Sequence, residues 1–182
     1  MQFDQVRNSN TISRLFGCFC WRYLMKLIIT ILILCATLTS VSVAADFAKG
    51  GTAIQRGDFA EAYKELKPLA EQGNVRAQFN IALMYDSGLG VTLDYVEAAK
   101  WYRKAAEQGL ADAQHNLAVI YAGGKGFEQD LVKTYFWFDL AAASGMDTAE
   151  RNRDTAASNM TAQQIAEARR KVQEWLEKHP AK

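Results

Sequence analysis

Cysteine is nearly absent from this chain of 182 residues. Cys18, Cys20 and Cys35 are the only three, and no cysteine follows them. From residue 46 onward the sequence therefore excludes a disulfide framework and a thiol nucleophile. Stability must come from apolar packing instead, and residues 46–182 are numerous enough to bury one core.

Residues with catalytic or metal-binding chemistry are equally scarce. The two histidines, His115 and His179, lie 64 positions apart, which is not the spacing of a metal site. No serine after residue 45 begins Ser-x-x-Lys, the signature of penicillin-binding enzymes, or lies in Gly-x-Ser-x-Gly. The glycine-rich stretch 123–126 lacks the Ser or Thr that follows lysine in a phosphate-binding loop. The sequence thus predicts no metal, no cofactor and no catalytic residue.

Neither sign of charge dominates. The formal net charge is +1, and removal of residues 1–45 would leave 17 basic and 19 acidic residues. No basic patch indicates a nucleic-acid partner, and no run of like charge indicates a charged tail. Charge alone therefore gives little information about the partner.

The N-terminal segment has the pattern of an export signal. Residues 25–45 carry a single charge at Lys26, then an apolar core, then the small residues Val43-Ala44-Ala45. This pattern predicts a signal peptide cleaved near Ala44 or Ala45, with residues 1–24 as an upstream extension or a long n-region. The alternative is an uncleaved membrane anchor, because 19 consecutive residues carry no charge. We therefore expect a periplasmic or secreted protein, or one anchored in the membrane and facing the periplasm.

The rest of the chain repeats itself every 36 residues. Residues 73–108 align without a gap on residues 109–144, and thirteen positions are identical. A weaker echo precedes the two units and another follows them. Such a period is typical of a solenoid built from stacked repeats.

Each unit reads as two helices. In the first unit, Ala77, Ile81, Ala82 and Tyr85 mark one helical face. Glycines at 88 and 90 then predict a tight turn, and Asp94 is placed to cap a second helix. The pairs Asp58/Glu61 and Asp94/Glu97 have the spacing of a capping box. The aromatic residues at positions 85, 101, 102, 121, 136, 137 and 138 recur at core spacing, and we predict that they pack inside.

The stretch AQFNIALMYDSGLGVTLDYVEAAKWYRKAAEQG resembles a Sel1-like repeat, a relative of the tetratricopeptide repeat. Ala82 and Ala118 depart from the family pattern by replacing its usual glycine, and Phe136 and Phe138 depart from it in the second unit. The resemblance implies an all-α fold, a right-handed superhelical solenoid of antiparallel helix hairpins. It also implies that the chain is a binding scaffold, although some secreted members have been linked to penicillin binding and β-lactamase activity.

We predict the following layout after the signal segment. Residues 46–73 form a shortened helix pair, 74–109 and 110–145 form the two full repeats, and 146–182 form a degenerate repeat with a C-terminal capping helix. The capping helix begins with a capping box, Thr161-x-x-Gln164. Its apolar stripe comprises Ile165, Ala168, Val172, Trp175 and Leu176, and Pro180 ends it.

In superhelices of helix pairs, the first helices line the concave face, where partners bind. The predicted groove residues are Arg76, Phe79, Asn80, Leu83, Asp112, His115, Asn116, Val119 and Asn152. The asparagines at 80, 116 and 152 recur at the repeat period and form a ladder of amides suited to peptide backbone groups. The alternative is that each amide only satisfies a neighbouring helix. The cations of a carboxylate clamp, which tetratricopeptide relatives use to bind chaperone tails, are missing here.

These observations favour a non-catalytic adaptor or scaffold that binds a protein or peptide partner in this mixed apolar and amide groove. The alternative function is a cell-wall-active hydrolase of the penicillin-binding or β-lactamase kind, which the family resemblance raises but no residue in the sequence supports.

Overall fold

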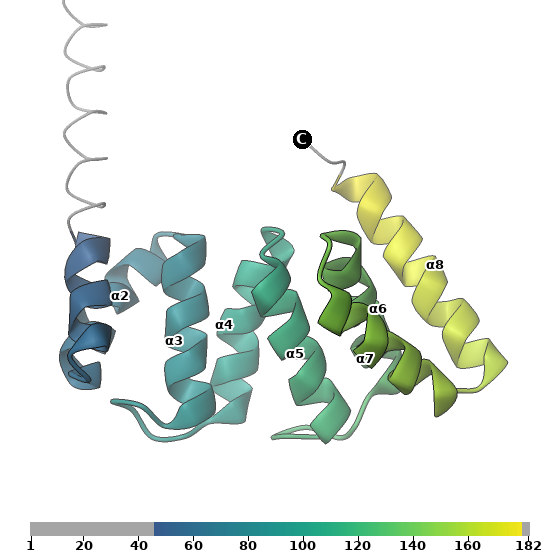
Figure 1. Ribbon diagram of the computed structural model, residues 1–182, viewed down its shortest axis with the longest axis horizontal. Helices are drawn as coiled ribbons and strands as arrows, with labels where there is room; N and C mark the ends of the chain where they lie inside the picture. The colour runs from purple at the N-terminus through teal and green to yellow at the C-terminus, as the bar shows by residue number, and fades with distance from the viewer. Residues whose placement is uncertain (1–45, 180–182) are drawn as a thin grey trace, which may run out of the picture. The chain divides into compact units, whose positions relative to one another are not determined.

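The structure, a computed structural model, describes residues 46–179, and within this range it contains only helices and the turns between them. Successive helices lie side by side along one direction and form an α-solenoid of antiparallel hairpins (Figure 1). The predicted signal segment 25–45, the stretch 1–24 and Pro180 lie outside the described residues. A helical segment over 46–55 comes first. It is followed by α2 (Phe59–Glu71), α3 (Val75–Ser87), α4 (Tyr95–Glu107), α5 (Ala111–Gly123), α6 (Leu131–Ala143), α7 (Asp147–Ser158) and α8 (Ala162–Lys178).

The helix starts follow from their capping residues. The carboxylate of Asp94 accepts hydrogen bonds from the backbone N–H groups of Val96 and Glu97, and Asp130 caps α6 in the same way. Thr161 and Gln164 form the predicted reciprocal capping box of α8. At Asp58 and Asp94 only half of the predicted capping box forms: the aspartate side chain accepts from the glutamate N–H, but the glutamate side chain does not reach back. The backbone N–H of Asp58 donates instead to the carbonyl of Ala53, and that of Asp94 donates to the carbonyl of Tyr85.

One turn glycine has no possible substitute. Gly90 has a positive φ of 72°, and a Cβ atom built there would lie 2.6 Å from the carbonyl oxygen of Phe59. The turn between α3 and α4 therefore lies directly against the start of α2, and only glycine permits both the backbone conformation and the close approach. The glycine pair that the sequence marks as a turn is thus also a packing contact.

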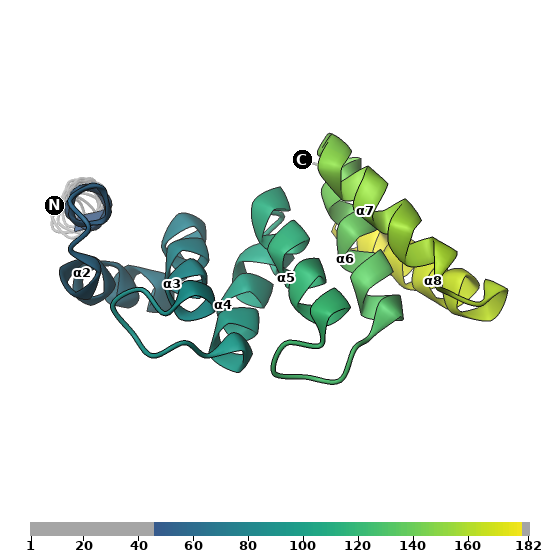
Figure 2. The ribbon, with the colours of Figure 1, turned by 60° about the horizontal axis from the view of Figure 1, so that its bottom comes forward.

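The core runs between two rows of helices. Each full first helix, α3 or α5, packs against the second helix on either side of it, and the first-helix row is visible beside the second-helix row in Figure 2. Alanines at these crossings are fully buried, including Ala77, Ala82, Ala105, Ala113 and Ala118. Small side chains let the helix axes approach closely, while Trp101, Tyr102 and Trp137 fill the space between crossings. Phe136 and Tyr85 are only half-buried, so the prediction that all of the recurring aromatic residues lie inside is wrong for these two.

Two buried glutamines join successive helices at the repeat period. Gln78 donates to the carbonyl of Ala70, and Gln114 donates to the carbonyl of Ala106, each at 3.1 Å. The free oxygen of Gln78 accepts from Gln108 at 2.8 Å. The position of Gln108 is occupied by Ser144 in the next unit, and Gln114 Oε1 is buried without a hydrogen-bond partner within the described chain.

The C-terminal end departs from the simple hairpin. α8 packs against α6 and makes little contact with α7, and Figure 1 shows it at the end of the row, tilted away from the other helices. Only Ala168 and Val172 of its predicted stripe are buried. Leu176 is 39% exposed, because α6 alone supports this helix and covers only a narrow band of it.

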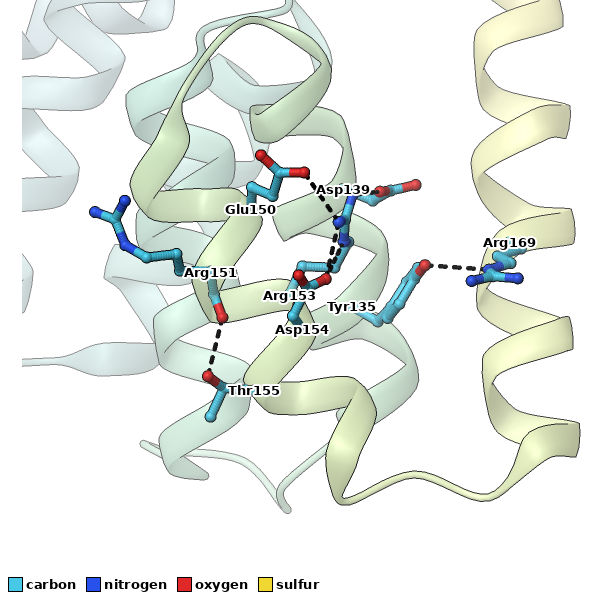
Figure 3. A network of polar contacts seen from close by, with 8 residues as sticks. All are labelled: Tyr135, Asp139, Glu150, Arg151, Arg153, Asp154, Thr155 and Arg169. Atoms are coloured by element: carbon cyan, nitrogen blue, oxygen red, sulfur yellow. Dashed lines mark hydrogen bonds and ion pairs between the residues drawn. The ribbon is translucent and has the colours of Figure 1, made fainter.

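Polar contacts fasten both end helices to α6 (Figure 3). Arg153 of α7 donates to Asp139 of α6 at 2.8 Å, and this hydrogen bond raises the pKa of the guanidinium. Arg169 of α8 donates to the hydroxyl of Tyr135 at 3.2 Å. α6 is therefore the element on which the whole C-terminal end depends.

Candidate functional site

All nine predicted groove residues lie on first helices, on α3, α5 and α7. Arg76, Asp112 and Val119 are exposed. The other six are half-buried, and none belongs to the core. We call these nine residues the first-helix face.

A chain of hydrogen bonds runs through this face across four helices. Tyr102 of α4 donates to Asp86 of α3 at 3.3 Å and accepts from Asn116 Nδ2 of α5 at 3.1 Å. His115 Nδ1 lies 3.3 Å from Asn116 Oδ1, and its Nε2 lies 3.1 Å from Asn152 Nδ2 of α7. These hydrogen bonds link successive repeats across the first-helix face, and we call the bonded side chains the polar wall.

The direction of each bond follows from the first donor. Asn116 uses its amide nitrogen on Tyr102, so its oxygen is the acceptor that faces His115. The Nδ1 of His115 must then carry the proton, and Nε2 is the acceptor for the amide of Asn152. The ring of His115 also packs edge-on against Phe138, with ring centroids 5.3 Å apart. Position and tautomer of this histidine are thus fixed by its neighbours.

Asn116 and Asn152, two of the three asparagines in the ladder, therefore hydrogen-bond to side chains of neighbouring helices. For these two, the alternative interpretation of the ladder applies. Asn80 is the exception, since no described residue hydrogen-bonds its side chain. The repeat explains the difference, because Leu66 occupies the position that Tyr102 has one unit later and offers no hydroxyl. Only this rung leaves its amide open.

Burial keeps the central hydroxyl neutral. Burial raises the pKa of Tyr102 above its ordinary value, and the nearby carboxylate of Asp86 adds to the effect. Between α2 and α3, a hydrogen bond of 2.8 Å joins the hydroxyls of Tyr63 and Tyr85, and this bond together with burial raises the pKa of Tyr85 to about 12. Both hydroxyls act as neutral hydrogen-bonding groups, not as acids or bases near neutral pH.

A hollow of about 260 Å3 opens beside the wall where α5, α6 and α7 meet. Its lining includes Leu131 and Phe138 of α6, and Asn152, Thr155 and Ala156 of α7. The repeat again supplies the reason. Ala156 lines the hollow and corresponds to the buried Ile120, so α7 has a smaller side chain here than the previous unit has.

The comparisons with known proteins agree with this architecture. The family model of the Sel1 repeat matches residues 75–110 and 111–146. The chain is a Sel1-repeat protein. It is similar to the crystal structure of a protective antigen of uropathogenic Escherichia coli that displays an SLR fold, with 34% identity and a TM-score of 0.69 over 74% of this chain and 30% of that one.

A second similar structure is a Sel1 repeat protein from Oxalobacter formigenes, with 35% identity and a TM-score of 0.54. That match covers 58% of this chain and 42% of the other. This Sel1-repeat protein therefore spans less than half the length of either structure. No match was found among curated proteins. Sel1 repeats form scaffolds that commonly mediate protein interactions.

The serines of this Sel1-repeat protein have structural roles where their partners are defined. Ser144 and Ser158 donate to helix carbonyls, and within residues 46–179 no serine hydroxyl contacts a histidine or lysine. The same residues contain no group of three potential metal ligands. No helix among them has the length and apolar character needed to cross a bilayer. No observation favours the hydrolase alternative.

Sequence reasoning missed the hollow, and it also missed a second pocket that is lined by residues of α4, α5, α6 and α8, Trp137 among them. The loss of side-chain volume at position 156, where the previous unit has Ile120, is visible in the 36-residue alignment and was the available signal for the hollow. No comparable signal marked this second pocket, because the pocket depends on where α8 lies.

Proposed function

We propose that this Sel1-repeat protein is an exported, non-catalytic scaffold that binds a peptide segment of a partner protein on its first-helix face. The observation that carries the proposal is the hollow where α5, α6 and α7 meet, which adjoins the first-helix face and is left open by the small side chain of Ala156. In this proposal an apolar side chain of the partner occupies the hollow, and its backbone runs along the face.

The chemistry of the hollow suits such a segment. Phe138 and Leu131 provide apolar contact, while Asn152, Thr155 and Asn159 place amide and hydroxyl groups at the lining. An extended peptide offers the same combination of apolar side chains and backbone hydrogen-bonding groups. Exposed Arg76, Asp112 and Val119 extend the contact surface along α3 and α5.

The proposal is tested by filling the hollow. Ala156→Ile restores the side chain that the preceding repeat has at this position, and the added apolar atoms occupy the space where the partner's side chain would lie. We expect the melting temperature to stay the same or rise, because the new side chain buries apolar area. Recovery of a partner first identified by cross-linking from residue 155 should fall by about tenfold.

The matched control is Ala60→Ile, which makes the same chemical change at an exposed position of α2. It should leave partner recovery unchanged. Equal recovery by the wild-type protein and Ala156→Ile would reject the hollow as the anchor point. Alanine replacement of Phe79 and Asn116 on the first-helix face would be less specific than Ala156→Ile. Both side chains contact Tyr102, so their loss would disturb the fold as well as the binding surface.

Export is proposed from residues 25–45 alone. If the signal is cleaved, N-terminal sequencing of the protein from a periplasmic extract should begin close to residue 45 or 46. A mature protein that still carries Lys26 would instead indicate the anchored form.

A further inference from the structure

A second surface lies on another side of α6. Because α8 tilts away from the hairpin row, it leaves a pocket of about 450 Å3 between itself and α4, α5 and α6. Phe136 and Trp137 of α6 form one wall, and Trp175 of α8 forms the other. This volume is within the range of roughly 300–1,000 Å3 that is typical of ligand pockets.

The charge of this pocket is strongly one-sided. Arg103, Lys133, Lys171 and Lys178 line it, against a single carboxylate, Glu174. Glu174 is itself paired with Arg170, which lies outside the lining. Lys178 makes no ion pair with any described residue, and Lys171 has only an exposed pairing of 3.6 Å with Glu167. Lys133 is paired with Asp130. The positive charge that the chain leaves available in the pocket therefore comes from Arg103, Lys171 and Lys178.

In the preceding repeat, lysine side chains cover the tryptophan that corresponds to Trp137. There Trp101, the counterpart of Trp137, lies under Lys104 at 3.9 Å and Lys67 at 4.9 Å from the ring centroid. In the second unit Leu140 replaces Lys104 and is buried, so no lysine from that position covers Trp137. The cations of this pocket therefore lie at its rim and do not cover the ring of Trp137.

We propose that this pocket, the α6–α8 pocket, binds an acidic peptide segment in which carboxylates flank an aromatic or bulky aliphatic residue. The apolar side chain packs between Trp137 and Trp175, and the carboxylates pair with Lys171, Lys178 and Arg103. Charge complementarity selects an acidic segment over a basic one, because like charges at this rim repel. The proposal is independent of the first-helix face, since the hollow lies on a different side of α6.

The test is titration calorimetry of the purified protein with the peptide acetyl-Asp-Phe-Asp-Asp-amide, alongside its Lys-Phe-Lys-Lys and Asp-Ser-Asp-Asp counterparts. We expect the acidic aromatic peptide to bind most tightly, and its affinity to fall as salt rises from 50 to 500 mM. The double variant Lys171→Glu/Lys178→Glu should weaken binding by about tenfold or more, because both reversed charges are exposed on α8 and face the ligand.

The matched control is Lys49→Glu/Lys64→Glu, which changes the net charge equally at exposed positions remote from the pocket. It should keep wild-type affinity, and circular dichroism should show both variants folded. Equal affinity in the two double variants, or equal binding of the basic peptide, would overturn the proposal. Binding of 3-phenylpropionate as tight as that of the peptide would overturn the peptide assignment in favour of a small aromatic acid.

Two further readouts separate this site from the first-helix face. Ala156→Ile should bind the acidic peptide normally, and Lys171→Glu/Lys178→Glu should recover the first-helix partner normally. Loss of both activities in either variant would mean that the α6–α8 pocket is not an independent site, and this too would overturn the proposal.

Discussion

At the scale of single residues, the buried amide of Gln114 shows how one substitution between repeats leaves a polar atom unsatisfied. Gln78, its counterpart, receives a hydrogen bond from Gln108, but Ser144 is too short to reach Gln114 Oε1. The backbone at the two positions is nearly identical, with φ and ψ of −87° and 4° at Gln108 and −86° and 5° at Ser144. Ser144 is also exposed, so a longer side chain meets no obstacle on its outer side.

We therefore predict that Ser144→Gln stabilises the protein. The new amide should donate to Gln114 Oε1 and raise the free energy of unfolding by about 1 kcal/mol, the usual net value of such a bond when it relieves an unsatisfied buried group. Urea denaturation measures the change. Ser158→Gln, the same substitution at the end of α7, serves as the control and should have little effect. An equal gain in both variants would show that glutamine at a helix end, not the restored bond, is responsible.

At the scale of elements, α6 depends on its N-terminal cap. Asp130 accepts from the backbone N–H of Lys133 at 2.9 Å and pairs with the ammonium of Lys133 at 2.9 Å. Burial opposes the charged form, but these contacts outweigh it and lower the pKa of Asp130 below its ordinary value of 3.8. A carboxylate with a lowered pKa in the folded state stabilises the fold above its ordinary pKa, and this contribution disappears as the pH falls through the folded-state value.

We predict that Asp130→Ala lowers the free energy of unfolding by about 1 kcal/mol at pH 7. The cost should shrink below about pH 4, where the wild-type carboxylate also becomes protonated. Asp130→Asn keeps a capping acceptor and should cost only a few tenths of a kcal/mol at pH 7. Chemical denaturation at a series of pH values measures both variants. A difference between wild type and Asp130→Ala that stays constant down to pH 2.5 would contradict the role of the charge.

The sequence predicts the helices and turns of the two full repeats well, because the same residue pattern occurs in both. Helix faces, turn glycines and the caps at Asp94 and Asp130 all depend on neighbours within a few positions. The partner of Asn116 could not be predicted, because position 102 of the preceding helix decides it, and a leucine or phenylalanine at the equivalent position removes the hydroxyl. The place of α8 could not be predicted either, since an apolar stripe shows which side of a helix is buried but not which neighbour covers it.

At the scale of the whole molecule, the solenoid is held together by contacts between adjacent helices, so stability should vary along the chain. α4 buries six residues and packs against α3 and α5, whereas α7 buries only Ala149 and Ala156 and packs mainly on α6. In such quasi-linear arrays each helix is stabilised by its nearest neighbours, and the end units open most easily.

We predict that hydrogen exchange under native conditions follows this gradient. Backbone amides of α4 and α5 should exchange most slowly, close to the global unfolding limit, and those of residues 46–55 and α7 should exchange fastest among the described helices. Occupation of the hollow by a bound segment should slow exchange in α7 selectively, because the ligand supplies the packing that this helix lacks. Exchange at one uniform rate from α2 to α8 would instead show a single cooperative unit, in which the contacts of Arg153 and Arg169 with α6 couple the C-terminal end fully to the two repeats.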